Sequence, residues 1–328
     1  MARRVFVLGK FMPPHAGHLH LCAFAQNLCD ELTILVCSLE REPIPGALRH
    51  AWMSALFPKA RVLHCSEEVP QDPSEHPDFW DIWRDLVKRY HPEPIDRVFA
   101  SEAYGLRLAQ ELEARFWPCD LDREAFDVSG TQVRNHPGRH WEMIAEPART
   151  WYSRTIVLHG PESTGKSTLG KRLAQRYGGM FVPEFGRVYC ETFGTECSAQ
   201  DLLNIAEGQD AAIDAARERA APLIMSDTDA ILTEVWSHMM LGRSAFTAKP
   251  PRAAGHLYLL TDIDQPWIND GTRVYGKDEE RRKFFDLSEA ALREYDLDFV
   301  HLKGSWEARE ATACAAIEAR FAHLLDLG

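Results

Sequence analysis

The sequence predicts an α/β protein with two domains, each a parallel sheet covered by helices on both faces. Three observations support this prediction. The chain has 328 residues, which is enough for two cores of ordinary size. Short apolar runs alternate with longer amphipathic runs, as they do where strands and helices alternate. The alternation restarts near residue 154, so we expect two domains, 1–150 and 151–328.

The first half contains four short apolar runs bounded by turn residues, a pattern that predicts strands. They are RVFVLG at 4–9, LTILVCSL at 32–39, ARVLHC at 60–65 and DRVFAS at 96–101. The helical spacing of apolar residues predicts helices over 16–29, 46–56 and 78–90. In the last of these helices, Trp80 and Trp83 are expected in the core.

The second half repeats the pattern with a different set of runs. Strands are expected at 154–160, 180–184, 221–227, 256–262 and 297–304, with a helix over 165–178. The segment 136–154 is rich in Trp, Met and Ile, so we expect it to pack as a helix between the two domains. Open parallel sheets bind ligands at the carboxyl ends of their strands, so each half should hold one site.

The composition weighs against several classes of protein. The formal net charge of −12 disfavours binding of a nucleic-acid backbone but not of nucleotides. The 8 cysteines form no C-x-x-C pair, and no apolar run approaches the about 20 residues needed to cross a bilayer. We therefore expect a cytoplasmic protein with reduced thiols and no membrane partner. The formation of a homo-oligomer stays open.

The stretch GPESTGKST, residues 160–168, matches the phosphate-binding pattern G-x-x-x-x-G-K-[ST] between a predicted strand and a predicted helix. Gly160 and Gly165 allow the backbone N–H groups to turn toward phosphate oxygens. Lys166 is expected to reach the β- and γ-phosphates, and Ser167 to bind Mg²⁺. The remaining expected ATP contacts are Glu162, Ser163, Thr164 and Thr168.

Charged residues follow the next strands and are candidates for the phosphate-accepting side of this site. They are Glu184 and Arg187 in FVPEFGRVY, and Asp227 and Asp229 in LIMSDTDA. Asp227 directly follows an apolar run, as a Mg²⁺ partner does in this class of site. Asp229 or Glu184 is expected to accept a proton from a substrate hydroxyl. The alternative is that these carboxylates cap helices or end strands.

The polar segment after Thr261 is rich in turn residues and contains Arg273 and the pair Arg281–Arg282. This composition suits a lid over the phosphates, in which Arg273 or Arg281 stabilises the transferred group. A solvated loop followed by a basic helix face explains the same residues equally well.

Two histidines follow the first strand in GKFMPPHAGHLH, residues 9–20. His15 and His18 lie at i and i+3, on one face of the first turn of a predicted helix. Three interpretations are open. His18 and Cys22 have the spacing of a zinc site but lack further ligands. The histidines can also cap the helix, or donate hydrogen bonds to an α-phosphate under attack.

The stretch GKFMPPHAGH resembles the G-x-F-x-P-x-H-x-G-H signature of the nucleotidyltransferase superfamily. VSGTQVR, residues 128–134, resembles the late motif of the same superfamily. The resemblance implies a Rossmann-like nucleotidyltransferase domain followed by a P-loop kinase domain. It also implies catalytic roles for His15 and His18. The implied ATP contacts are Gly9, Lys10, Phe11, Ser129, Gly130, Thr131 and Arg134.

The combination resembles the NadR-type bifunctional enzymes. It includes SEAYG, PEFGR, SDTD and PWINDGTR in the order of that family. The resemblance implies a kinase half that makes nicotinamide mononucleotide from nicotinamide riboside. It also implies a first half that joins the mononucleotide to the adenylyl group of ATP, giving NAD and pyrophosphate. Both steps use ATP and Mg²⁺. The expected nicotinamide contacts are Glu102, Tyr104, Trp52, Arg187, Trp267 and Asp270.

Some members of this family carry an N-terminal helix-turn-helix domain and act as repressors. Here the first predicted strand begins at about Arg4, so we expect neither that domain nor DNA binding. Two alternatives remain at this stage. One is a pantetheine-phosphate adenylyltransferase fused to a dephospho-coenzyme A kinase, which would use the same motifs. The other is a nucleotide-sensing regulator without catalysis.

Overall fold

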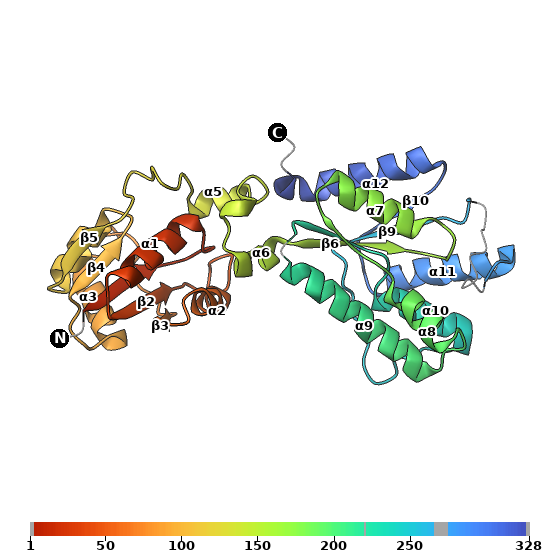
Figure 1. The fold of residues 1–328 in the computed structure, drawn as a ribbon, viewed down its shortest axis with the longest axis horizontal. Coiled ribbons are helices and arrows are strands. Elements are labelled where there is room, and N and C mark those ends of the chain that lie inside the picture. Colours follow the sequence, from red (N-terminus) through yellow and green to blue (C-terminus); the bar gives the residue numbers. More distant parts are fainter. Residues whose placement is uncertain (1–2, 220, 266–274, 326–328) are drawn as a thin grey trace. The chain divides into compact units, whose positions relative to one another are not determined.

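The computed structural model describes residues 3–219, 221–265 and 275–325 (Figure 1). The chain divides into two compact units, the N-terminal unit Met1–Arg149 and the C-terminal unit Thr150–Gly328. Each unit contains one five-stranded sheet in which all strand pairs are parallel. The predicted fold class, α/β with two parallel sheets, is confirmed.

The sheet of the N-terminal unit has the strand order β3-β2-β1-β4-β5. The strands are β1 Arg4–Gly9, β2 Glu31–Cys37, β3 Arg61–Cys65, β4 Arg97–Ala100 and β5 Arg115–Pro118. Val5 of β1 pairs with Leu32 on one side and with Arg97 on the other. The chain therefore adds strands first on one side of β1 and then on the other. This reversal between β1 and β4 opens a crevice at their carboxyl ends.

Helices cover both faces of this sheet because its central strands are apolar on both sides. One core combines Val5, Val7 and Ile34 with α1 Ala16–Asn27 and α2 Gly46–Leu56. The other combines Phe6 and Leu35 with α3 Phe79–Tyr90 and α4 Tyr104–Glu111. The chain continues through α5 Gly130–Asn135, the 3₁₀ turn η1 Trp141–Met143 and α6 Glu146–Tyr152. The segment 136–154 is therefore not the single helix that the sequence predicted.

The sheet of the C-terminal unit has the strand order β10-β9-β6-β8-β7. The strands are β6 Arg154–His159, β7 Met180–Val182, β8 Leu223–Ser226, β9 Leu257–Thr261 and β10 Phe299–Leu302. The central strand β6 lies between β8 and β9 and leads directly into the phosphate-binding pattern. The carboxyl ends of β6, β7 and β8 therefore meet at one edge.

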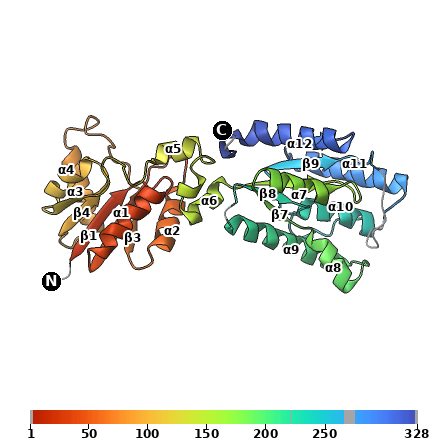
Figure 2. The same ribbon diagram turned by 45° about the horizontal axis from the view of Figure 1, so that its top comes forward.

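The helices of the C-terminal unit are α7 Lys166–Arg176, α8 Phe185–Phe193, α9 Ala199–Glu218, α10 Ala230–Leu241, α11 Asp278–Glu294 and α12 Trp306–Phe321, followed by the 3₁₀ turn η2 Ala322–Leu324. Figure 1 shows α7 and α12 on one side of the sheet, with α9 and α10 on the other. In the turned view of Figure 2, α8 again lies beside α9 at the edge of the unit.

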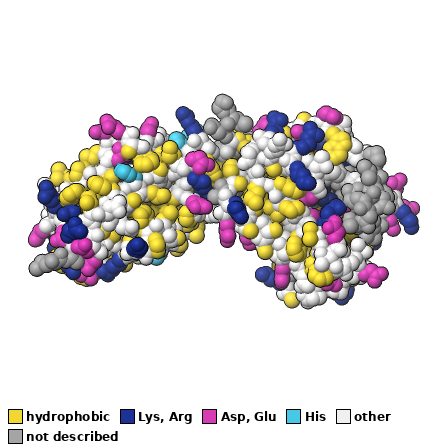
Figure 3. Space-filling model, viewed as in Figure 1, with side chains coloured by type: hydrophobic (Ala, Val, Ile, Leu, Met, Phe, Trp, Pro, Cys, Tyr) yellow, Lys and Arg dark blue, Asp and Glu magenta, His cyan; other side chains and the backbone are white. Residues whose placement is uncertain are grey.

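The distribution of surface charge and the length and polarity of the helices are consistent with the composition of the chain. On the face drawn in Figure 3, each unit carries basic and acidic side chains interspersed with one another. Across the described residues, no helix combines the length and the apolar character required to cross a membrane.

Candidate nucleotide-binding sites

The phosphate loop of the C-terminal unit joins β6 to α7 through backbone conformations that favour glycine. Gly160 has φ +120°, and a Cβ atom there would lie 2.8 Å from the carbonyl oxygen of Thr261. Gly165 has φ +87°, and a Cβ atom there would overlap the ring of Trp306. The loop therefore fits against β9 and α12 only with glycine at both positions.

The first residues of α7 bring the cationic and hydroxyl groups of the motif into a cavity. The Lys166 ammonium group donates to the carbonyl oxygens of Gly160 at 2.9 Å and Pro161 at 2.7 Å. The predicted residues that line the cavity with Lys166 are Glu162, Ser163, Gly165, Ser167 and Thr168. The hydroxyl of Thr164 is instead buried, where it donates to Pro161 and contacts Thr261. Gly160 and Thr164 therefore shape the loop rather than line the cavity.

Asp227 follows β8 and brings a carboxylate to the start of α7. Its side chain is buried, and its Oδ2 accepts a hydrogen bond from the Ser167 hydroxyl. Its Oδ1 is also buried and has no hydrogen-bond partner among the described residues. A buried carboxylate oxygen beside a serine hydroxyl fits a hard, oxygen-binding cation such as Mg²⁺.

Glu184 lies across the cavity at the start of α8. Burial, with a further contribution from Asp227, raises the pKa of its carboxyl to about 7, although Lys166 and Arg187 oppose the shift. Gln209 holds this turn, because it accepts the Phe185 N–H and donates to Ser226. A carboxyl whose pKa lies near neutrality is suited to proton transfer at the pH of the cell. Arg187, one turn into α8, lines the same cavity.

Thr228, next to Asp227, has an unusual backbone conformation. Its φ of +109° is rare for a β-branched residue and costs on the order of 1–3 kcal/mol. The Ser226 hydroxyl holds the Thr228 carbonyl at 2.7 Å and is itself held by Gln209. Strained residues of this kind gather at functional sites, and Thr228 lines the cavity.

The remaining wall of this cavity is mostly apolar and was not predicted. Trp236 and Met240 come from one face of α10, and the other members are Cys190, Cys197, Leu202 and Ile205. The run AILTEVWSHMML has apolar residues on several sides of the helix. The sequence therefore did not distinguish a helix that lines a pocket from one buried in the core.

The prediction that Asp229 accepts a proton is wrong. Asp229 is fully buried at the N-terminus of α10. One carboxylate oxygen accepts the N–H groups of Ile231 and Leu232, and the other accepts from Ala254 and Tyr258. Both oxygens are occupied within the fold, so Asp229 is a helix cap.

Two further predicted residues lie elsewhere. Trp52 is buried on α2 and is not among the residues that line the cavity of the N-terminal unit, so the structure does not support its predicted contact with a nucleotide. Arg281 is buried on α11, where it donates to the carbonyl oxygen of Gln265, and it is not among the residues that line the cavity of the phosphate loop. Three other predicted residues, Trp267, Asp270 and Arg273, lie outside the described residues.

The N-terminal unit has a cavity of about 600 Å³ at the carboxyl ends of β1 and β4, where the strand order reverses. The predicted residues that line it are Gly9, Lys10, Phe11, His15, His18, Glu102, Tyr104, Ser129, Gly130, Thr131 and Arg134. A cavity of this size at such a reversal is typical of nucleotide sites in α/β folds.

His15 and His18 form a buried pair at the start of α1, with their ring centroids 3.8 Å apart. Burial lowers the pKa of His15 to about 4, and the nearby Arg123 adds to the shift. Burial also lowers the pKa of His18 well below its usual value, with contributions from His15 and Arg123. Both rings are therefore neutral near pH 7 and can donate an N–H without carrying charge.

The two motifs of the N-terminal unit, distant in sequence, form a single site. Arg134 donates to the carbonyl oxygen of Met12 and to the Thr131 hydroxyl at 3.0 Å. A Cβ atom at Gly130 would lie 2.8 Å from that same Met12 oxygen, so the approach requires glycine. The Ser129 hydroxyl caps α5 by accepting the N–H of Gln132.

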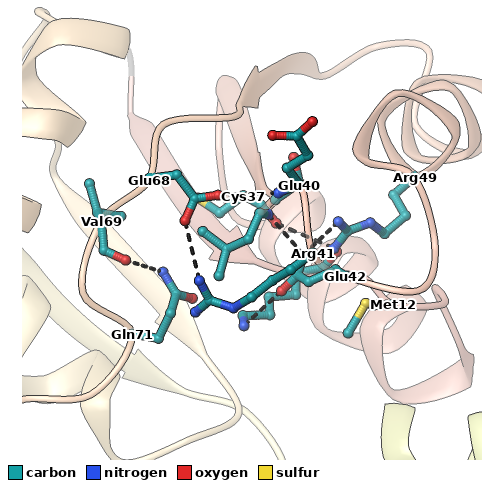
Figure 4. Close-up of polar contacts among 12 residues, drawn as sticks. Met12, Cys37, Glu40, Arg41, Glu42, Arg49, Glu68, Val69 and Gln71 are labelled. Carbon is teal, nitrogen blue, oxygen red and sulfur yellow. Dashed lines mark hydrogen bonds and ion pairs between the residues drawn. The ribbon is translucent and has the colours of Figure 1, made fainter. Parts of the chain in front are cut away.

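Lys10 is the exposed end of an ionic network, with Glu42 and the buried Arg49, that the sequence did not reveal. Its ammonium group lies 2.8 Å from Glu42, whose other oxygen accepts from Arg49 at 2.6 Å. Figure 4 shows the Arg49 guanidinium directed at Glu42 and at the carbonyl oxygen of Cys37. Arg49 also donates to the Lys10 carbonyl at 2.9 Å, which fixes the turn after β1.

Several other residues of this cavity were not predicted as part of a site. Trp80 and Trp83 line it instead of lying only in the core, and the Trp83 indole donates to Pro70. Arg123 and Phe126 also line it, from the loop after β5. Cys22, the second residue of the zinc interpretation, is buried in the core. Within the described part of the chain, no group of three or more suitable side chains could hold a metal.

The folds and sites define the class of the protein. It is a nucleotide-binding α/β protein with a Rossmann-like unit and a P-loop unit. Residues 155–309 match the family model of the AAA domain.

Comparison with known proteins identifies its relatives. The chain is 29% identical over 321 residues to the "Trifunctional NAD biosynthesis/regulator protein NadR" of Salmonella typhimurium and to that of Escherichia coli, covering 90% of this chain and 78% of each relative. The chain is homologous to the NadR proteins.

Two further comparisons concern one unit and the overall fold. A nicotinamide-nucleotide adenylyltransferase of Picrophilus torridus is 25% identical over 152 residues, covering 44% of this chain and 86% of the relative. A crystal structure of a NadR protein in complex with NAD and AMP-PNP has a TM-score of 0.73 at 23% identity, covering 98% of this chain and 97% of that one. A second, in complex with NR, has a TM-score of 0.74 at 23% identity, covering 97% and 96%. These two structures support the fold.

Proposed function

We propose that this chain is a bifunctional enzyme of NAD biosynthesis. The C-terminal unit phosphorylates nicotinamide riboside with ATP, and the N-terminal unit joins the resulting mononucleotide to the adenylyl group of a second ATP. The observation that carries the proposal is that each unit has its own cavity at the carboxyl ends of its strands, lined by the charged and polar residues of its motifs. The homology to NadR proteins supports it.

In the C-terminal unit, the 5′-hydroxyl oxygen of the riboside attacks the γ-phosphorus of ATP, and ADP leaves. Glu184 accepts the hydroxyl proton, and Lys166 moves from the loop carbonyls to the phosphates when ATP binds. Ser167 and Asp227 would hold Mg²⁺, which neutralises charge on the phosphates when it is bound. Arg187 lies on the acceptor side of the cavity.

The apolar wall of the same cavity is suited to bind the nicotinamide ring of the proposed substrate. A cationic pyridine ring stacks well on an aromatic face, and Trp236 presents one beside Met240. The buried carboxylate of Asp227 and the half-buried carboxylate of Glu184 make the cavity favourable for a cation. We infer that the nicotinamide ring lies against Trp236.

In the N-terminal unit, a phosphate oxygen of the mononucleotide attacks the α-phosphorus of ATP, and pyrophosphate leaves. The attacking phosphate is already ionised, so the step requires charge stabilisation rather than a base. His15 and His18 donate N–H groups to the α-phosphate, while Ser129, Thr131 and Arg134 hold the other phosphates. Glu102 and Tyr104 lie after β4, where we place the mononucleotide. We expect both reactions in the cytoplasm.

The test is direct. The purified chain is incubated with Mg-ATP and, separately, nicotinamide riboside, nicotinamide mononucleotide or dephospho-coenzyme A, and the products are separated by chromatography. The proposal requires mononucleotide from the riboside and NAD from the mononucleotide. If neither nicotinamide compound gives a product, the proposal fails, and a product from dephospho-coenzyme A alone would redirect it to coenzyme A synthesis.

A further inference from the structure

The N-terminal cavity must bring together two anions, and its lining supplies few available positive charges. Burial keeps His15 and His18 neutral, so they donate hydrogen bonds but add no charge. Among the described residues that line the cavity, the permanent cations are Lys10, Arg123 and Arg134.

These three cations differ in how firmly the fold already holds them. The Lys10 ammonium group is paired with Glu42 at 2.8 Å. The Arg134 guanidinium donates to the Met12 carbonyl and to Thr131. Arg123 lies 3.6 Å from Glu102, which is too long for a hydrogen bond, and 42% of its side chain is exposed. Arg123 is therefore the cation with the most hydrogen-bonding capacity left for a ligand.

The loop that carries Arg123 is fixed against the histidine helix. The Asp120 carboxylate accepts the N–H groups of Ala125 at 3.0 Å and Phe126 at 3.2 Å. The Arg123 N–H donates to the Asp120 carbonyl at 3.0 Å. Phe126 packs against the first turn of α1, because a Cβ atom at Gly17 would lie 3.9 Å from its Cβ. The loop thus holds Arg123 within 3.6 Å of Glu102 and near enough to His15 and His18 to lower the pKa of both rings.

We propose that Arg123 binds the phosphate group of the mononucleotide that attacks ATP, and so holds the two anionic substrates together. This inference rests on the proposed adenylyltransferase activity. Arg123 lines the same cavity as the histidines, where the α-phosphate is placed, and lies 3.6 Å from Glu102, where the mononucleotide is placed. Its planar guanidinium can donate two parallel hydrogen bonds to one phosphate, and its weak pairing with Glu102 is exchanged for this stronger contact.

The first experiment compares Arg123→Ala, Arg123→Lys and the wild-type chain in steady-state adenylylation. Arg123→Ala should raise the KM for nicotinamide mononucleotide by about 10- to 100-fold, the usual range for a lost charge-assisted hydrogen bond. The KM for ATP and the riboside kinase rate of the same chain should not change. Arg123→Lys should restore part of the affinity, because it keeps the charge but loses the paired donors.

A matched control is Arg61→Ala. Arg61 is likewise half-exposed and paired with one carboxylate, Glu93, but it lies outside the cavity. This variant should keep wild-type constants for both reactions. An unchanged mononucleotide KM in Arg123→Ala, or a rise confined to ATP, would overturn the inference.

Two measurements do not depend on turnover. Calorimetry with nicotinamide mononucleotide alone should show weaker binding to Arg123→Ala than to the wild-type chain. In an NMR titration, loss of Arg123 should move the pKa of His15 upward from about 4, because Arg123 contributes to lowering it. A wild-type chain that makes no NAD would refute the proposed function. Equal calorimetric affinities of the two chains would refute the role of Arg123.

Discussion

The two cavities occupy equivalent places, at the carboxyl ends of parallel strands, but they differ in the groups able to take part in proton transfer or hydrogen bonding. The C-terminal cavity is lined by the carboxylates Glu162, Glu184 and Asp227 and by the cations Lys166 and Arg187, and the pKa of Glu184 is about 7. The N-terminal cavity holds two neutral imidazoles, His15 and His18, with three cationic side chains around its lining.

The nucleophile of each proposed reaction explains this difference. A ribose hydroxyl must lose a proton as it attacks, so its site needs a carboxylate with a pKa near neutrality. A nucleotide phosphate attacks as an anion, so its site needs donors and positive charge but no base. The two units share a topology, and the different side chains at their strand ends suit each unit to its own proposed reaction.

The largest expected effect is the loss of one activity with no change in the other. Lys166→Ala should lower riboside phosphorylation by about 10³-fold, because the transition-state charge loses its cation. Adenylylation of the mononucleotide by the same chain should be unchanged in a coupled NAD assay. The control Lys171→Ala alters an exposed lysine of the same helix and should affect neither activity. Loss of both activities in a folded Lys166→Ala chain would contradict the two-site model.

The reciprocal change tests the imidazole site. His18→Ala should lower kcat for adenylylation by about 10²-fold, the usual cost of one transition-state donor. Riboside phosphorylation should stay at the wild-type rate. His50→Ala provides the comparison, since His50 lies on α2 outside the cavity. If His18→Ala still makes NAD at the wild-type rate, the histidines are structural.

The pH dependence should also distinguish the two cavities. Glu184 must be ionised to accept a proton, and its pKa is about 7. The kinase kcat/KM should therefore fall as the pH drops below about 7, while adenylylation should show no such step there. Glu184→Gln should remove this step and lower the rate by about 10²-fold. Glu191→Gln, on the exposed surface of α8, should keep the wild-type profile.

The smallest expected effect concerns the strained turn beside Asp227. Thr228→Gly should raise the free energy of unfolding of the C-terminal unit by about 1 kcal/mol, because glycine tolerates the positive φ. It should also slow the kinase several-fold, since Asp227 loses its rigid neighbour. Asp296→Gly relieves a φ of +50° at an exposed turn and should stabilise without slowing the kinase. Thermal unfolding and riboside phosphorylation of both variants measure the difference.

Most of the fold was predictable because its signals are local. The helix predicted over 46–56 is α2 residue for residue, and the first strand is β1 as predicted. The edge strand β5, RFWP, was not predicted, because it is short and only partly apolar. The helices α8, α9, α10 and α12 were also not placed, and α11 was considered only as a basic helix face. In α10, buried residues lie on several sides of the helix, so its periodicity is weak.

The site residues that were predicted belong to compact motifs, in which spacing alone fixes the geometry. The prediction failed where tertiary structure gives different roles to residues that are close together in the sequence. In SDTD both aspartates follow the same strand, and only the helix that begins at Ala230 makes Asp229 its cap. Glu42 and Arg123 were not recognised because only tertiary packing brings Glu42 to Lys10 and Arg123 to the cavity.

The contact between α12 and the phosphate loop affects the order in which the two sites can form on the ribosome. Trp306 packs against Gly165, and the buried Arg309 donates to the carbonyl oxygen of Thr164 at 2.9 Å. These residues are synthesised long after the loop they hold, whereas the residues around the N-terminal cavity all precede Thr150. Domains fold as units during synthesis, the N-terminal one first. The nascent chain can therefore complete its adenylylation site well before its phosphate loop is locked.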